Sequence, residues 1–182
     1  MELDFLNWLQ GIRTPGLDYF FKILTTLGDH AEIWLLIILF LFFYKKKKET
    51  AVLAVVAIVI ELIIVSLILK PIFSRPRPFL VDPIDLLISR PQGSSFPSGH
   101  SASSFAVAVL LFREKVKFRV PILIVAFLMA FSRLYVFVHY PSDVVVGSII
   151  GILIGLVVHK NRQYILNKYR KVFNNIEFLK LD

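Results

Sequence analysis

Long apolar runs constrain this chain more than any other feature. Four runs cover residues 30–44, 50–72, 118–138 and 143–159, and a shorter run, 99–112, begins with polar residues. Hydrophobic residues make up 57% of the 182 residues and charged residues 19%, whereas soluble domains have about 45–50% and about 25%. A small domain buries a limited share of its surface, so one aqueous core cannot hide this much apolar surface. We therefore expect an all-α integral membrane bundle.

Two N-terminal segments are less apolar than these runs. Residues 1–13 carry Phe5 and Trp8 beside several leucines, which predicts an amphipathic helix lying in the membrane interface. A helix over 16–28 follows, and whether it crosses the bilayer stays open because a spanning helix needs about 20 apolar residues. With this helix counted, we expect about six transmembrane helices in a single domain over 1–182.

Most basic residues lie between or after the apolar runs, in three clusters. The clusters are Lys45 to Lys48; Arg113, Lys115, Lys117 and Arg119; and Lys160, Arg162, Lys168, Arg170, Lys171 and Lys180. If every helix spans, the clusters share one membrane face, which the positive-inside rule makes cytoplasmic, and 160–182 is a basic cytoplasmic tail. The net charge of +8 then reflects membrane topology, and we expect no nucleic-acid partner.

Five other cations fall on the opposite face and break this bias: Lys70, Arg75, Arg77, Arg90 and Arg133. Of these, Lys70, Arg77 and Arg133 are able to surround an anion, and Arg presents a planar fork that matches phosphate oxygens. Ser98 and Gly99 stand at the start of a helix, where free N–H groups and the helix dipole favour negative charge. Glycine also lets the backbone come close to a ligand. Together these residues predict a phosphate-binding site.

Two histidines add chemistry that permanent cations lack. Of His100 and His139, one is able to act as a nucleophile and the other to pass a proton to the leaving oxygen. Asp143 lies four residues after His139, close enough to accept the imidazole Nδ1–H and leave Nε2 free to attack. The chain has no cysteine, which excludes a thiol nucleophile.

These residues form three motifs that occur in order over 70–143. The motifs are Lys70-x6-Arg77-Pro78, Pro97-Ser98-Gly99-His100 and Ser132-Arg133-x5-His139-x3-Asp143. They resemble, without substitution, the tripartite signature of the type-2 phosphatidic acid phosphatase family. That family includes lipid phosphate phosphatases and bacterial undecaprenyl pyrophosphate phosphatases.

The resemblance implies a role for each site residue. His139 would be the nucleophile that forms a phosphohistidine, Asp143 would orient it, and His100 would protonate the leaving group and then activate water. The residues implied in phosphate binding are Lys70, Arg77, Ser98, Gly99 and Arg133, with His100 beside them. No metal or other cofactor is implied, because the cations do the electrostatic work.

The same resemblance places the reaction at a membrane surface. We expect a multi-pass protein of the cytoplasmic (inner) cell membrane, whose site faces the extracytoplasmic side and takes a lipid substrate from the bilayer. The compact chain favours undecaprenyl pyrophosphate, with phosphatidylglycerol phosphate, phosphatidate and a lipid A phosphate as alternatives.

Two rivals from other classes are a non-catalytic phosphate-lipid binding or transport protein and a vanadium-dependent haloperoxidase. The haloperoxidases have a similar site but are soluble, and the apolar composition counts against one. The oligomeric state stays open.

Several charged residues lie outside the motifs. Arg75 and Arg90 would contact a second phosphate or a lipid headgroup, although snorkelling to the interface or solvation is the favoured interpretation. Asp29 and His30 would either shape the entrance or cap a helix. Residues 86–88 would either dip into the interface at a lipid entrance or form a plain surface loop.

Glu61 lies within a long apolar run, where a carboxyl normally marks function or a buried partner. It precedes Lys70 by nine residues, about half a turn off in azimuth on an α-helix. We therefore expect a structural carboxyl that points away from the site.

Three glycines repeat at every fourth position in the last apolar run. Gly147, Gly151 and Gly155 lie on one face of the predicted helix. The absence of side chains on that face predicts a neighbouring helix at close range.

Overall fold

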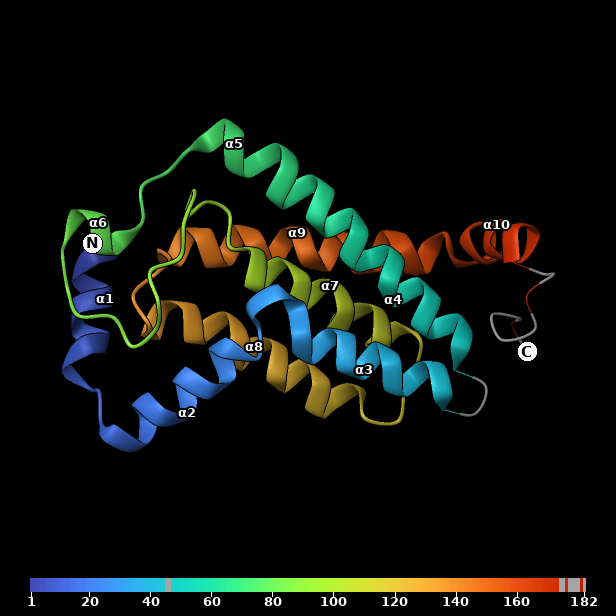
Figure 1. The fold of residues 1–182 in the computed structure, drawn as a ribbon, viewed down its shortest axis with the longest axis horizontal. Helices are drawn as coiled ribbons and strands as arrows, with labels where there is room; N and C mark the ends of the chain where they lie inside the picture. The colour runs from blue at the N-terminus through green and yellow to red at the C-terminus, as the bar shows by residue number, and fades with distance from the viewer. Residues whose placement is uncertain (45–46, 174–175, 177–180, 182) are drawn as a thin grey trace.

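The structure is a computed structural model that describes residues 1–44, 47–173, 176 and 181. Its described residues form helices and connecting turns, without strands (Figure 1). The elements are α1 (Glu2–Gly11), α2 (Pro15–Thr26), the 3-10 turn η1 (Asp29–Ala31), α3 (Glu32–Phe43), α4 (Lys48–Glu61), the π-helix η2 (Leu62–Leu69), α5 (Lys70–Phe73), α6 (Pro78–Val81), α7 (Gly99–Arg113), α8 (Arg119–Tyr135), α9 (Pro141–Lys160) and α10 (Arg162–Phe173). The expected all-α class is confirmed for this part of the chain.

Two of the described segments are long and apolar enough to cross a bilayer. They are Lys48–Val81 and Pro141–Lys160. Helix α3 is apolar but has 12 residues. Helix α2 also has 12 residues, so at 1.5 Å per residue it is roughly 18 Å long, shorter than the hydrocarbon core of about 30 Å. The count of about six transmembrane helices stays a prediction.

Helix α7 lies at the centre of the bundle and packs tightly against α9. A Cβ on any of the three glycines of α9 would overlap backbone atoms of α7. The overlaps are Gly147 with Ser98, Gly151 with Ala102, and Gly155 with Ala106. The close approach predicted from the glycine spacing is therefore confirmed, and it sets the position of the first turn of α7 against the first turn of α9.

Helix α1 lies at one end of the bundle, near α6 and the end of α8 (Figure 1). Its Leu6 and Leu9 are buried in a hydrophobic cluster, while Trp8 is exposed. Gln10 donates a hydrogen bond to the carbonyl of Tyr135. The helix is amphipathic as expected, and its place in a membrane interface stays a prediction.

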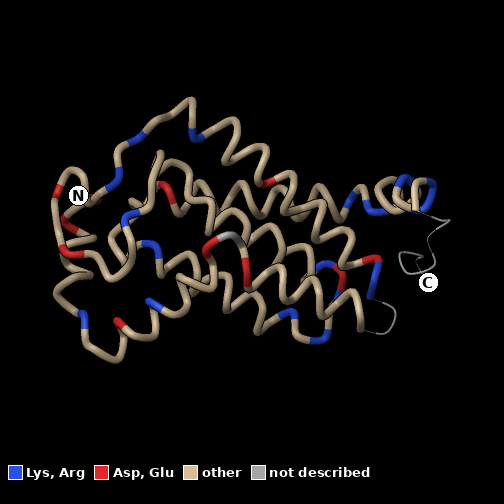
Figure 2. Tube along the Cα trace, in the orientation of Figure 1, with Lys and Arg blue, Asp and Glu red and all other residues tan. Residues whose placement is uncertain are grey.

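The basic clusters gather at the opposite end of the bundle. Figure 2 shows the lysines and arginines of the α7–α8 connection and of α10 at the end away from α1. Arg162 and Arg170 both pair there with Glu49 of α4. Lys45, Lys46 and Lys180 lie outside the described residues. The cytoplasmic location of this end stays a prediction.

Candidate active site

The three motifs converge on one cavity of about 360 Å³, called here the cationic cavity. Its lining residues are Asp29, Lys70, Arg77, Ile88, Ser89, Pro91, Gln92, His100, Arg133 and His139. They come from η1, the start of α5, the segment before α6, the loop before α7, the first turn of α7, the last turn of α8 and the α8–α9 turn. Of the predicted site residues, Ser98, Gly99 and Asp143 are not part of this lining.

His139 and Asp143 are both buried at the start of α9. The His139 Nδ1 atom lies 3.5 Å from Oδ2 of Asp143, and the same oxygen accepts the backbone N–H of Tyr140 at 2.8 Å. The carboxylate thus caps α9 and faces the imidazole at once. Nδ1 of His139 is buried without a hydrogen bond at this separation, and contacts of this kind often shorten when substrate binds.

The other nitrogen of His139 faces cations. Its Nε2 lies 3.4 Å from a terminal guanidinium nitrogen of Arg77. Burial lowers the pKa of His139 well below its ordinary value, and the nearby charges of Arg133 and Arg77 lower it further. The imidazole is therefore neutral at neutral pH, the form with a free lone pair that a nucleophile needs.

Backbone carbonyls hold the Arg77 guanidinium in place. It donates to the carbonyls of Gln92, Gly93 and Val138 at 3.2, 3.1 and 3.1 Å. Because these acceptors are neutral, the positive charge remains available to an anion in the cavity. The loop 88–93 therefore both walls the cavity and positions one of its cations.

Arg133 and His100 each have a partner from the N-terminal part of the chain. Arg133 is 2% exposed and donates to the hydroxyl of Thr25 in α2. His100 Nε2 lies 3.0 Å from Oδ1 of Asp29 in η1. Although α2 is too short to span a bilayer alone, it supplies contacts that position the site.

Ser98 connects the second motif to the third. Its side chain accepts the N–H of Ser101 at 3.4 Å, which caps α7. Its own N–H donates to the carbonyl of Asp143 at 3.0 Å. A Cβ on Gly99 would lie 3.6 Å from Nζ of Lys70, so the ammonium group lies directly over the start of α7.

Residues 50–166 match the sequence profile described as the PAP2 superfamily, and they contain all three motifs. The chain belongs to the PAP2 superfamily. It is therefore a lipid phosphatase of this family, as the motif resemblance implied, and two of its described helical segments are long and apolar enough to cross a membrane.

Three relatives show how wide this similarity is. The chain is 33% identical over 147 residues to decaprenylphosphoryl-5-phosphoribose phosphatase of Mycobacterium tuberculosis, covering 81% of each chain. It is 32% identical to the undecaprenyl-diphosphatase BcrC of Bacillus subtilis over 52% of this chain. That match covers 49% of the relative, so the chain spans about half of its length. The crystal structure of Aquifex aeolicus LpxE aligns with a TM-score of 0.75 at 34% identity, over 87% of this chain and 94% of that one.

Arg75, outside the PAP2 signature, is part of the site. It donates to Oδ1 of Asp143 at 2.6 Å, to the hydroxyl of Ser142 at 2.7 Å and to Oε2 of Glu2 at 2.7 Å. Its guanidinium also lies over the ring of Tyr140, 4.0 Å from the centroid. The predicted snorkelling of Arg75 is wrong, because three acceptors hold its head group inside the protein.

Glu2 is a further residue that the sequence analysis did not find. Its Oε1 accepts the N–H of Ser142 at 2.9 Å, while its other oxygen pairs with Arg75. Burial alone would raise the pKa of Glu2, but the bonds from Ser142 and Arg75 outweigh that effect and hold it below the ordinary value. Its position at the start of the chain carries no signal of this role.

Other residues singled out from the sequence lie differently. Arg90 is exposed, 5.9 Å from the ring centroid of Phe79, and does not line the cationic cavity. Asp29 lies at the site, beside His100, whereas the side chain of His30 is outside the described part of the structure. Residues 86–88 pack against a buried hydrophobic cluster, so they are not a plain surface loop.

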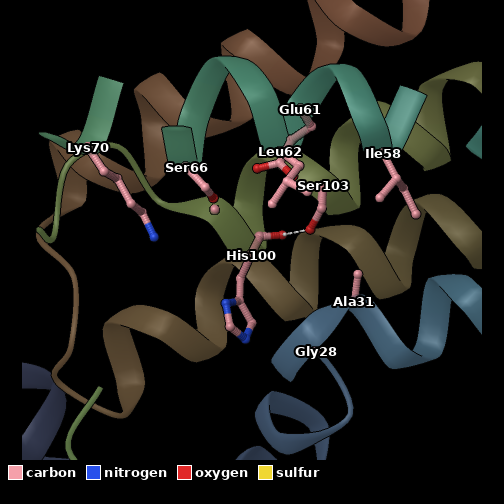
Figure 3. Close-up of a pocket in the computed structure, with 10 residues that line it drawn as sticks. Gly28, Ala31, Ile58, Glu61, Leu62, Ser66, Lys70, His100 and Ser103 are labelled. Carbon is pink, nitrogen blue, oxygen red and sulfur yellow. Dashed lines mark hydrogen bonds between the residues drawn. The ribbon is translucent and has the colours of Figure 1, made fainter. Parts of the chain in front are cut away.

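Glu61 lies in the site region, contrary to expectation. Glu61 and Lys70 line the same second cavity, also about 360 Å³ (Figure 3). The lining residues of this second cavity are Gly28, Ala31, Ile58, Glu61, Leu62, Ser66, Lys70, Gly99, His100 and Ser103. The prediction assumed an α-helix throughout, but η2 is a π-helix, whose i→i+5 hydrogen bonds give a wider turn with less rotation per residue. The two side chains therefore face the same way.

Proposed function

We propose that this PAP2 enzyme hydrolyses the phosphate headgroup of a membrane lipid through a phosphohistidine on Nε2 of His139. The observation that supports it most directly is the burial of a neutral imidazole between Asp143 and the Arg77 guanidinium, at the wall of a cationic cavity. The Nε2 lone pair attacks phosphorus, and the bond from phosphorus to the lipid oxygen breaks. Asp143 stabilises the positive charge that His139 gains.

His100 would move the protons. Its imidazolium donates a proton to the leaving oxygen, and the neutral imidazole then takes one from a water that attacks the phosphohistidine. Phosphate leaves, and Nε2 of His139 recovers its lone pair. Burial and the charge of Arg133 disfavour protonated His100, and the negative charges of Asp29, 3.0 Å away, and of the bound phosphate would offset them.

Three cations would hold the phosphoryl group during both steps. Lys70, Arg77 and Arg133 all line the cationic cavity, and Ser98 and Gly99 present the start of α7 beside it. Charge on the phosphoryl oxygens is then stabilised by groups fixed before the reaction begins. Buried, oriented cations do this more effectively than solvated ones.

The site lies at the end of the bundle opposite the basic clusters (Figure 2). By the positive-inside rule this end would face the extracytoplasmic side of the cytoplasmic membrane. Undecaprenyl pyrophosphate remains the substrate that the compact chain favours, with lipid phosphomonoesters as alternatives. The candidate substrates are ranked by measuring the release of inorganic phosphate from each lipid of this panel in detergent.

Trapping the covalent intermediate tests the proposal. The detergent-solubilised enzyme is mixed with a lipid carrying a labelled phosphoryl group and quenched rapidly in alkali. We expect label on His139 in the wild-type protein and none in His139→Ala. His159→Ala, at the far end of α9, is the matched control and should label normally. Phosphate release without label on His139 would contradict the phosphohistidine mechanism.

A further inference from the structure

The second cavity adjoins the cationic cavity. Lys70 and His100 line both cavities, so these two side chains form the boundary between them. On the proposed mechanism, the nucleophile His139 lies on the cationic side and His100 protonates the leaving oxygen. Because His139 lines the cationic cavity and not the second one, a leaving group opposite His139 would lie beyond His100, in the second cavity.

One carboxyl oxygen in the second cavity has no hydrogen-bond partner, although the charge of Lys70 acts on it. Glu61 is 6% exposed, and its Oε1 is buried without a hydrogen bond. A buried polar atom that stays unpaired costs stability unless a ligand or water satisfies it. A carboxyl oxygen accepts hydrogen bonds, so its natural partner is a ligand that donates one.

The surroundings of Glu61 suit a small polar group next to a phosphate. Figure 3 shows Glu61, Ser66 and Lys70 on one helix face, above His100 and Ser103. The hydroxyl of Ser103 already donates to the carbonyl of His100 at 3.3 Å. A Cβ on Gly99 would lie 3.8 Å from Glu61 Oε1, so this oxygen lies close to the start of α7, where the phosphate is expected.

We propose that the second cavity binds the leaving alcohol and that Glu61 accepts a hydrogen bond from a free hydroxyl on it. This inference rests on the proposed function and narrows its substrate class. It would place a lipid phosphomonoester whose leaving group is a polyol, such as glycerol or a sugar, with a hydroxyl close to the ester oxygen, ahead of the undecaprenyl pyrophosphate that the compact chain favours. A diphosphate lipid would instead bring anionic oxygens toward an oxygen that needs a donor.

A matched pair of substrates tests this hydroxyl contact. Lysophosphatidate has a free hydroxyl on the carbon next to the phosphate-bearing carbon, and the acylated propanediol phosphate is the same molecule without it. A hydrogen bond to a carboxylate predicts that wild-type kcat/KM is roughly tenfold or more higher for lysophosphatidate. In Glu61→Leu that ratio should fall to about one, because the acceptor is gone.

Two controls separate the hydroxyl contact from a general effect on the cavity. Ile58→Ala changes an apolar wall of the same cavity and should leave the substrate ratio as in the wild type. Glu61→Gln keeps an acceptor oxygen and should retain part of the preference for lysophosphatidate. This variant also tests the contact if Glu61→Leu does not fold.

Three results would overturn the inference, and they differ in what else they affect. Equal kcat/KM of the wild-type enzyme for the two substrates contradicts the subsite but leaves the phosphatase mechanism intact. The same holds if Glu61→Leu slows both substrates equally. If neither of these substrates nor any lipid of the panel released phosphate, the proposed function would be overturned as well.

Discussion

Arg75 donates to Oδ1 of Asp143 at 2.6 Å, on the opposite carboxylate oxygen from the one that faces His139. The two oxygens thus have separate partners, and the Arg75 contact sets the rotation of the carboxylate. Glu2 holds the guanidinium from its other side at 2.7 Å. Through these contacts, α1 is connected to the proposed nucleophile by an unbroken series of charged groups.

Replacing Arg75 by lysine should lower kcat by about ten- to a hundredfold with little change in KM. A lysine ammonium is a single point charge and cannot reproduce the fork that contacts Glu2, Ser142 and Asp143 together. Steady-state phosphate release measures both constants. Arg90→Lys, at an exposed arginine, is the control and should behave as wild type. A rise in KM alone would mean that Arg75 binds substrate directly.

The imidazole of His139 should stay neutral at pH values where an ordinary histidine is protonated. Its pKa is lowered because burial and the neighbouring arginines disfavour the charged form. The neutral form therefore persists as the pH falls through about 6.5, the ordinary histidine value. A ¹⁵N NMR titration in detergent micelles, with the signal assigned through His139→Gln, measures this. Protonation of His139 at or above that value contradicts the burial described here.

Gly151→Ala should destabilise the protein by about 1–3 kcal/mol. The added Cβ would overlap the carbonyl oxygen of Ala102, and backbone atoms cannot move aside as a flexible side chain does. Thermal unfolding in detergent shows this as a lower midpoint. Gly16→Ala is the control, because a Cβ there has no atom within 4 Å. Equal midpoints for the two variants would contradict the close α7–α9 packing.

Thr25→Val should reduce kcat/KM by roughly tenfold, since it leaves the buried Arg133 head group without its hydroxyl acceptor. Valine has nearly the same shape, so the packing of α2 is retained. Thr26→Val is the neighbouring control, because its hydroxyl bonds only within α2, to the carbonyl of Lys22. Loss of activity in both variants would indicate a general effect on α2 rather than on Arg133.

Much of the fold and site follows from local sequence. The apolar run 50–72 predicts a helix, and the structure has continuous helix from Lys48 to Phe73. Likewise, Asp143 lies in the first turn of α9, and its carboxylate lies near His139, which precedes that helix. Both features are local because backbone hydrogen bonds and cap contacts involve residues near in sequence.

The failures have a different cause. The face on which Glu61 lies depends on the hydrogen-bond register of η2, and residues 62–69, which are apolar except for Ser66, carry no mark of a π-helix. Even a small change of rotation per residue, summed over that segment, moves a side chain to another face.

By itself, the sequence determined the membrane-protein class, the helices and the set of cations and imidazoles in the three motifs. Only the tertiary structure decided the partners of Arg75 and Glu2. Arg75 meets Asp143 across 68 positions, and Glu2 meets Ser142 across 140. Contacts so distant along the chain depend on how α1, α5 and α9 pack together, which no short stretch of residues specifies.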